Sequence, residues 1–101
     1  MKPLEWEKVT HFGRDHFVSG IYKLTSYTYW NGREVTKYWC AYYITERGEN
    51  WGDVVDTTQR KKMHTMQQCK DMCNKHAETY IPSMRQFDIA ARSVATMKEN
   101  P

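Results

Sequence analysis

The chain has 101 residues, of which 40% are hydrophobic and 14% aromatic, and its formal net charge is +3. The hydrophobic content excludes a disordered chain, no apolar run reaches the roughly 18 residues that cross a bilayer, and the length favours one domain spanning residues 1–101. Residues 1–58 carry seven Lys or Arg and eight Asp or Glu, whereas residues 59–101 carry eight and four. This basic bias is weaker than that of a typical nucleic-acid-binding domain.

The N-terminus and the cysteines predict a cytoplasmic protein without a membrane partner. The segment Met1–Glu7 carries charges where a signal peptide needs its apolar stretch. Three cysteines, an odd number without the spacing of a disulfide framework, are typical of reduced thiols in a cytoplasm.

Aromatic and aliphatic side chains recur at spacings of three in the N-terminal region, at Trp6, Val9 and Phe12. This spacing between residues 1 and 16 predicts either a short helix or an irregular arm packed by its aromatic side chains.

The Asn31-Gly32 pair joins two runs of alternating apolar residues. Asn-Gly favours a type I′ hairpin turn, because both residues tolerate the positive φ that this turn requires. We therefore expect a strand from about Phe17 to Tyr29 and a second from Glu34 to Thr45. With a two-residue loop Trp30 would pair with Arg33, and every side chain can then be assigned to one face.

Both predicted faces of this hairpin carry aromatic side chains. The first face holds Tyr22, Leu24, Trp30, Val35, Trp39, Ala41 and Tyr43. The second face holds Ile21, Lys23, Thr25, Tyr27, Tyr29, Glu34, Thr36, Tyr38, Cys40 and Tyr42. If the helices of the chain cover only one face, the other presents a tyrosine surface.

A shorter third strand is expected at Trp51–Thr58, where Asp53 and Asp56 suit an edge position. Thr65 and Gln68 then have the spacing of a capping box, which predicts a helix from Met66 to Tyr80. Its apolar stripe is Met66, Cys69, Cys73, Ala77 and Tyr80.

Pro82 ends this helix, and Ser83 with Gln86 repeats the capping-box spacing before a second helix. The predicted stripe of the second helix is Met84, Phe87, Ala90 or Ala91, Val94 and Met97. The expected fold is therefore α+β with the order β-β-β-α-α, in which a three-stranded antiparallel sheet is packed on one face by a C-terminal helix pair.

Two clusters suggest chemistry. Cys69, Cys73 and His76 share one helical face, and with Cys40 they form a Cys3His set that suits zinc. The sequence has no Cys-x-x-Cys knuckle and both helical cysteines occupy core positions, so we expect buried thiols and no metal or other cofactor.

The second cluster consists of His11, Arg14, Asp15 and His16, the raw material of a general base. No nucleophile context and no glycine-rich phosphate loop accompany it, so we expect a charged turn and no enzymatic activity.

The tyrosine surface suits a macromolecular partner, since Tyr and Trp dominate protein interfaces. The predicted protein-binding residues are Tyr27, Tyr29, Trp30, Arg33, Tyr38, Tyr42 and Lys23. A nucleic-acid-binding module would instead use the same face for base stacking together with basic residues for phosphate. The predicted basic residues are Arg60, Lys61, Lys62 and Lys70. The face could also be covered by the N-terminal arm or by a second copy in a homodimer.

Several short patterns carry a resemblance to a group of proteins. They are Gly20-x-Tyr22-x-Leu24, Asn31-Gly32, Trp39-x-Ala41-x-Tyr43 and a Thr-capped helix with Cys69, Cys73 and Ala77. Over residues 17–80 the chain resembles small accessory proteins encoded by phages and prophages. The resemblance implies a protein of the host cytoplasm that binds and blocks a host complex, such as CRISPR, restriction or polymerase machinery.

Lys61-Lys62 ahead of a helix is also similar to double-stranded-RNA-binding domains, whose order is α-β-β-β-α. That likeness implies contacts to RNA, although the chain lacks the Gly-x-Gly lead-in and adds a second C-terminal helix.

Overall fold

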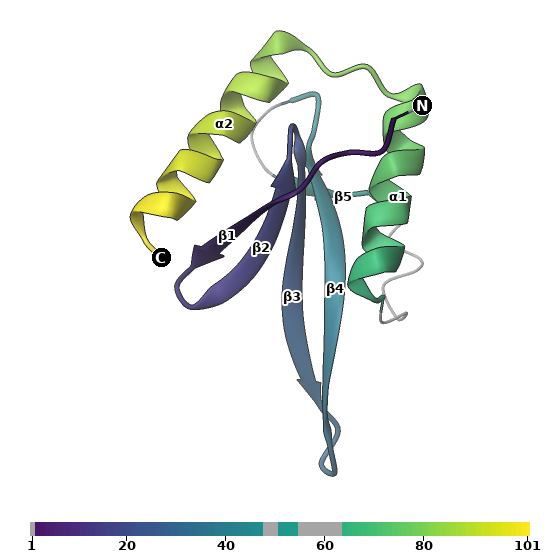
Figure 1. Cartoon of the computed structure of the whole chain (residues 1–101), viewed down its shortest axis with the longest axis vertical. Coiled ribbons are helices and arrows are strands. Elements are labelled where there is room, and N and C mark those ends of the chain that lie inside the picture. Colours follow the sequence, from purple (N-terminus) through teal and green to yellow (C-terminus); the bar gives the residue numbers. More distant parts are fainter. Residues whose placement is uncertain (1, 48–50, 55–63) are drawn as a thin grey trace.

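The computed structural model describes residues 2–47, 51–54 and 64–101. Its strands are β1 (Glu7–His11), β2 (Arg14–Ser19), β3 (Tyr22–Trp30), β4 (Val35–Ile44) and β5 (Trp51–Asp53), and its helices are α1 (Met66–Thr79) and α2 (Met84–Glu99). The strands form one antiparallel sheet in the order β1-β2-β3-β4-β5 (Figure 1). The α+β class is confirmed, but the expected three-stranded sheet is wrong, because the described residues form five strands.

The N-terminal region forms a hairpin instead of the expected helix or arm. Val9 pairs with His16 across β1 and β2, and both are buried on one face of the sheet. Phe12 and Gly13, with φ of 49° and 74°, make the turn between the strands. Side chains in these strands alternate between the two faces of the sheet with a period of two. The spacing of three between Trp6, Val9 and Phe12, which predicted a helix, therefore does not reflect the local structure. Two strands therefore occupy the place where a likeness to double-stranded-RNA-binding domains implies an N-terminal helix.

The expected long strand at residues 17–29 is divided by a tight turn. Gly20 has a φ of 55°, which only glycine adopts easily, and the chain reverses between Ser19 and Tyr22. A Cβ atom at Gly20 would lie 3.3 Å from Cε1 of Phe87, so this position has both a conformational and a steric requirement. The turn separates β2 from β3.

The β3–β4 hairpin has a four-residue loop in place of the predicted two-residue loop, because Trp30 pairs with Val35 and not with Arg33. The Asn31 Oδ1 atom accepts hydrogen bonds from the backbone N–H groups of Arg33 and Glu34, each at 3.0 Å. Gly32 has a φ of 93°, but Asn31 does not have the positive φ that a type I′ turn needs. The shift of two residues preserves the alternation, so the side chains lie on the two faces as predicted.

Strand β5 is an edge strand, as Asp53 suggested. The expected strand continued to Thr58, but β5 ends at Asp53, Val54 is a bend, and residues 55–58 lie outside the described residues.

Both predicted capping boxes are present. Thr65 Oγ1 accepts from the Gln68 backbone N–H at 3.1 Å, and Gln68 Oε1 accepts from the Thr65 backbone N–H at 2.8 Å. Ser83 and Gln86 repeat this arrangement at the start of α2. The helix bounds agree with prediction to within a residue or two, since these signals are local.

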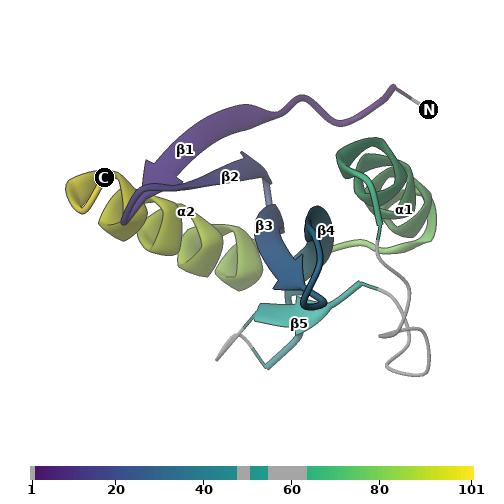
Figure 2. The ribbon, with the colours of Figure 1, turned by 90° about the horizontal axis from the view of Figure 1, so that it is seen from below.

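The two helices lie on opposite faces of the sheet (Figure 2), and the predicted helix pair on one face is wrong. Helix α1 buries Cys69 and Cys73 with Leu24 on one face. Helix α2 buries Met97 against Val9 and Val18 on the other face. The β1–β2 hairpin supplies this second apolar patch, which explains why a helix covers each face.

The N-terminal segment crosses from β1 towards α1 (Figure 1), where the Leu4 backbone N–H donates to Asn74 Oδ1 at 2.9 Å. In the described part of the chain, neither helix has the length and apolar character to cross a membrane.

Candidate macromolecule-binding surface

The end of the β3–β4 hairpin, residues 28–37, is exposed at every position; we call it the hairpin end. The pairing of β2 with β3 stops at His16–Thr25, and in the described residues the outer edge of β4 is last paired at the Trp39–His64 bridge. The two strands therefore continue as a ribbon beyond the rest of the sheet (Figure 1).

The hairpin end carries large apolar side chains on both faces. Trp30 and Val35 are cross-strand partners that share one face, and they are 70% and 68% exposed. Tyr29, which is 48% exposed, lies on the other face and pairs with Thr36. An exposed tryptophan beside an exposed valine is costly in water unless a partner covers it, so this is the first candidate contact.

The loop that joins the strands is ordered by side-chain hydrogen bonds. Because Asn31 accepts from the backbone of Arg33 and Glu34, the loop is held in one conformation before any partner binds. Lys37 is the last residue of the hairpin end, and its Nζ atom is 5.2 Å from the centroid of the Trp39 ring.

Three tyrosines at the base of the ribbon, Tyr27, Tyr38 and Tyr42, form what we call the tyrosine cluster. The hydroxyl groups of Tyr27 and Tyr42 are hydrogen-bonded at 2.9 Å, and the rings of Tyr27 and Tyr38 stack with centroids 5.6 Å apart. All three residues are half-buried. These contacts separate the cluster from Tyr29, which is 48% exposed.

Cationic side chains lie over the tyrosine cluster and its surroundings. The Arg14 guanidinium is 5.2 Å from the Tyr27 ring centroid, and Lys23 Nζ is 5.6 Å from the Tyr42 ring and 4.4 Å from the Trp51 ring. Burial lowers the pKa of Lys23. Burial and the hydrogen bond with Tyr27 raise the pKa of Tyr42 well above its usual value. The cluster is therefore a packed layer of rings and cations.

The basic residues of the nucleic-acid alternative are not brought to this layer. Lys70 lies on the face that α1 covers, where its Nζ atom is 5.4 Å from the centroid of the Phe17 ring. Arg60, Lys61 and Lys62 lie outside the described residues.

The structure does not bring the three cysteines and His76 together as the four ligands of the Cys3His set. Cys69 and Cys73 are fully buried, and burial raises the pKa of each thiol to about 12. Cys40 lies with the tyrosines on the opposite face, and the His76 Nδ1 atom is 2.8 Å from the Tyr22 hydroxyl. Across residues 2–47, 51–54 and 64–101, no three His, Cys, Asp or Glu side chains could hold a metal ion together.

The cluster at the β1–β2 turn makes contacts within the fold. His11 Nδ1 donates to the backbone carbonyls of Met97 and Asn100, at 3.2 and 2.9 Å, and this ties the C-terminus of α2 to the turn. His16 Nδ1 is 2.9 Å from Thr25 Oγ1, and burial lowers the pKa of His16 to about 4.

Sequence reasoning misses Val35 and Arg14 as members of this surface. The alternation assigns Val35 to the apolar face with the core residues, and its position beyond the reach of α1 depends on how far the ribbon projects. The sequence places Arg14 in a charged turn, and only the unexpected β2 strand brings it beside Tyr27.

Comparison with protein families, curated sequences and solved structures finds no match for this chain.

Proposed function

We propose that this chain is a non-enzymatic binding protein that docks its hairpin end on a protein surface of a macromolecular complex. The observation that carries the proposal is the pair Trp30 and Val35, which are 70% and 68% exposed at the end of a projecting ribbon.

Three features support a preformed binding element. Tryptophan is strongly enriched in binding hot spots, and Val35 extends the apolar patch that Trp30 forms. The Asn31 side chain fixes the loop, and the tyrosine cluster stiffens the base of the ribbon. A rigid element loses little conformational entropy when it binds, which favours affinity from a small contact area.

A protein partner fits the hairpin end better than nucleic acid does. The only charged residues among positions 28–37 are Arg33, Glu34 and Lys37, a net charge of +1. A ribbon that follows a phosphate backbone needs more cations, since each phosphate contact is made by Lys, Arg or a polar donor.

The consequence of binding would be occlusion of the surface that the hairpin end covers. The resemblance to phage and prophage accessory proteins suggests a CRISPR, restriction or polymerase complex in the cytoplasm of a bacterial host as the partner.

Affinity capture from a bacterial lysate tests the proposal. Immobilised wild-type protein should retain a specific protein, whereas the Trp30→Ala/Val35→Ala variant should lose it. Phe12→Ala is the matched control, because Phe12 is an exposed aromatic residue (77%) at a different turn. With the captured protein purified, the double substitution should weaken binding by about 2 kcal/mol or more.

A nuclease arm and a salt series separate the two partner classes. Capture should survive nuclease treatment and respond weakly to salt. Tight binding to DNA or RNA alone, with affinity falling log-linearly with salt, would contradict the proposal and favour the nucleic-acid alternative. Equal capture by wild type and by the double variant would also contradict it.

A further inference from the structure

Helix α2 carries a second apolar stripe that the fold leaves uncovered. The sequence predicts one stripe that includes Met84 and Phe87, but these residues are 78% and 43% exposed, while Ala90 and Met97 are buried with Gln86. The exposed stripe continues along the helix with a spacing of three or four residues. It consists of Met84, Phe87, Ala91 and Ala95, preceded by Ile81, which is 93% exposed.

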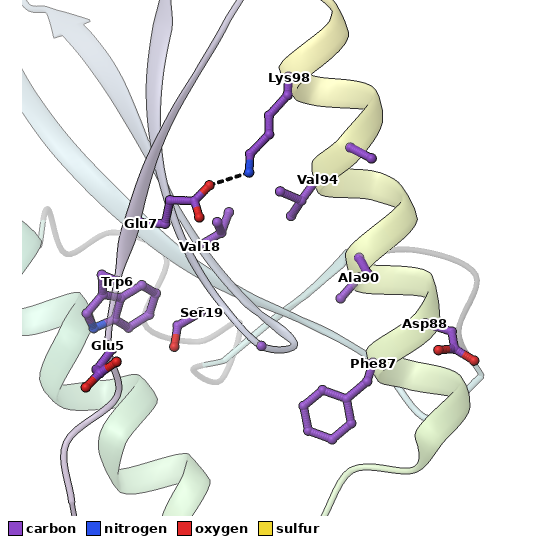
Figure 3. A pocket seen from close by; sticks show the side chains of 13 residues that line it. Glu5, Trp6, Glu7, Val18, Ser19, Phe87, Asp88, Ala90, Val94 and Lys98 are labelled. Atoms are coloured by element: carbon purple, nitrogen blue, oxygen red, sulfur yellow. Dashed lines mark ion pairs between the residues drawn. The ribbon is translucent and has the colours of Figure 1, made fainter.

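A groove runs beside this stripe, between α2 and the strands β1 and β2 (Figure 3). Trp6, which immediately precedes β1, and Val18 of β2 line one side, and Phe87 and Val94 of α2 line the other. Lys98 and Glu7 close one end with an ion pair. The exposed stripe adjoins the groove, and together they form one mostly apolar surface whose lining also includes Glu5 and Asp88.

We infer that a second copy of the chain covers this surface, with the α2 helices of the two copies packed antiparallel about Ala91. Such an arrangement has two-fold symmetry, so both copies use the same residues. The closest residue at the axis is an alanine, which lets the helices approach. Phe87 of one copy lies opposite Ala95 of the other, so that a large side chain meets a small one.

The charged flank of α2 is complementary to itself in this orientation. Arg85, Asp88, Arg92 and Glu99 lie on one flank of the stripe, at positions that a helix of 3.6 residues per turn brings to one side, and Asp88 also belongs to the lining of the groove. Figure 3 shows Phe87 and Asp88 pointing to different sides of α2. Among the described residues, no ion pair involves any of these four side chains.

An antiparallel pair centred on Ala91 places Asp88 of each copy near Arg92 of the other, and Arg85 near Glu99. All four charges then gain a partner of opposite sign. A parallel pair would instead place this charged flank against the partner's groove, whose described lining combines Trp6 and Val18 with carboxylates such as Glu5. The cation in that lining, Lys98, is already paired with Glu7, so Asp88 and Glu99 would gain no free partner there. The charge pattern therefore favours a second copy in the antiparallel orientation.

Sedimentation velocity on the whole chain, from low micromolar to near-millimolar concentration, tests the inference. Wild type should show a monomer–dimer equilibrium. Ala91→Glu should abolish the dimer, because two carboxylates would meet at the axis. Gln67→Glu is the matched control, since it adds a negative charge at an exposed position of α1, on the other face of the sheet, and should leave the dimer intact.

Charge reversal gives a second, independent measurement. Asp88→Arg and Arg92→Asp should each raise the dimer dissociation constant by about tenfold or more, because each places like charges opposite one another. An equal mixture of the two variants should recover a heterodimer of near wild-type affinity, because the two reversed side chains would then face each other with opposite charges. These exposed substitutions should leave the circular dichroism spectrum unchanged.

A wild-type protein that stays monomeric over the whole concentration range would overturn the inference. A dimer that Ala91→Glu leaves intact, or one that Trp30→Ala abolishes, would place the interface elsewhere and overturn it too. Failure of the charge-reversed mixture to recover the dimer would overturn the antiparallel arrangement.

Discussion

Trp30 and Val35 face each other across the β3–β4 hairpin and remain 70% and 68% exposed, whereas Trp39, on the same face of β4, is 9% exposed. The strand pairing is continuous between them, so the difference arises from the position of α1, which covers the base of the ribbon. One face of one hairpin therefore serves the core at its base and a partner at its end.

The two tryptophans should respond differently to truncation. Trp39→Ala removes a core side chain and should lower the free energy of unfolding by about 3–5 kcal/mol. Trp30→Ala removes only a cross-strand contact and should lower it by about 1 kcal/mol or less. Urea denaturation followed by circular dichroism measures both. A loss at Trp30 as large as that at Trp39 would show that the hairpin end is part of the core.

The hydrogen bond between Tyr27 and Tyr42 should stabilise the ribbon. Tyr42→Phe removes the hydroxyl and leaves that of Tyr27 without this partner, which should cost about 0.5–1.5 kcal/mol in the free energy of unfolding. Tyr29→Phe is the matched control, because Tyr29 is 48% exposed, and it should change the free energy by a few tenths at most. In an alkaline titration monitored by ultraviolet absorbance, the Tyr42→Phe variant should have one fewer tyrosine whose pKa is raised above its usual value.

The parts of the fold that the sequence predicts well are those set by neighbouring residues. The start of each helix depends on a side chain three residues from its cap, as for Thr65 and Gln68, and the strand faces depend only on a period of two. The predicted hairpin register is wrong by two residues because Asn31 uses its side chain to accept hydrogen bonds from the loop backbone. A dipeptide pattern does not distinguish that turn from a type I′ turn.

The candidate surface is predictable in composition but not in exposure. The sequence places Tyr27, Tyr38 and Tyr42 on one face, and the structure agrees, but their rings and hydroxyl groups contact one another and are half-buried. Contacts between side chains from different strands depend on register, so alternation alone could not separate them from Tyr29. The sequence also could not show which side of α2 is buried, because the strands that cover that side belong to the β1–β2 hairpin, which was not predicted.

The three thiols should react slowly in the folded protein. Cys69 and Cys73 are fully buried and have a pKa raised to about 12, and burial also raises the pKa of the half-buried Cys40. In the native protein, labelling with an aromatic disulfide reagent at neutral pH should modify Cys40 slowly and leave Cys69 and Cys73 unmodified. After unfolding, all three thiols should react rapidly. Fast reaction of two or three thiols in the native protein would contradict the buried positions of α1.

Stability should fall as the pH falls from about 6.5 to about 4, and His16 is a principal cause. Burial is the largest reason that its pKa is lowered from 6.5 to about 4, and the charges of Lys23, His11 and Arg14 lower it further. The neutral imidazole, whose Nδ1 atom lies 2.9 Å from Thr25 Oγ1, is the form that the fold accepts.

The sign follows from proton linkage. Between the two pKa values the unfolded chain binds a proton at His16 and the folded protein does not, so the free energy of unfolding rises with pH in this window. A pKa difference between 6.5 and about 4 corresponds to about 3 kcal/mol, which is fully present above pH 6.5 and is lost as the pH falls to about 4. His16→Gln, which keeps a polar group beside Thr25, should flatten the pH dependence in this range.

Nuclear magnetic resonance titration of the His16 ring provides the direct measurement. The ring signals should stay those of the neutral form until the pH approaches 4. Because burial outweighs the nearby charges, Lys23→Gln should raise the pKa only part of the way back towards 6.5. A return to the ordinary value in that variant would show that Lys23, and not burial, controls the pKa of this histidine.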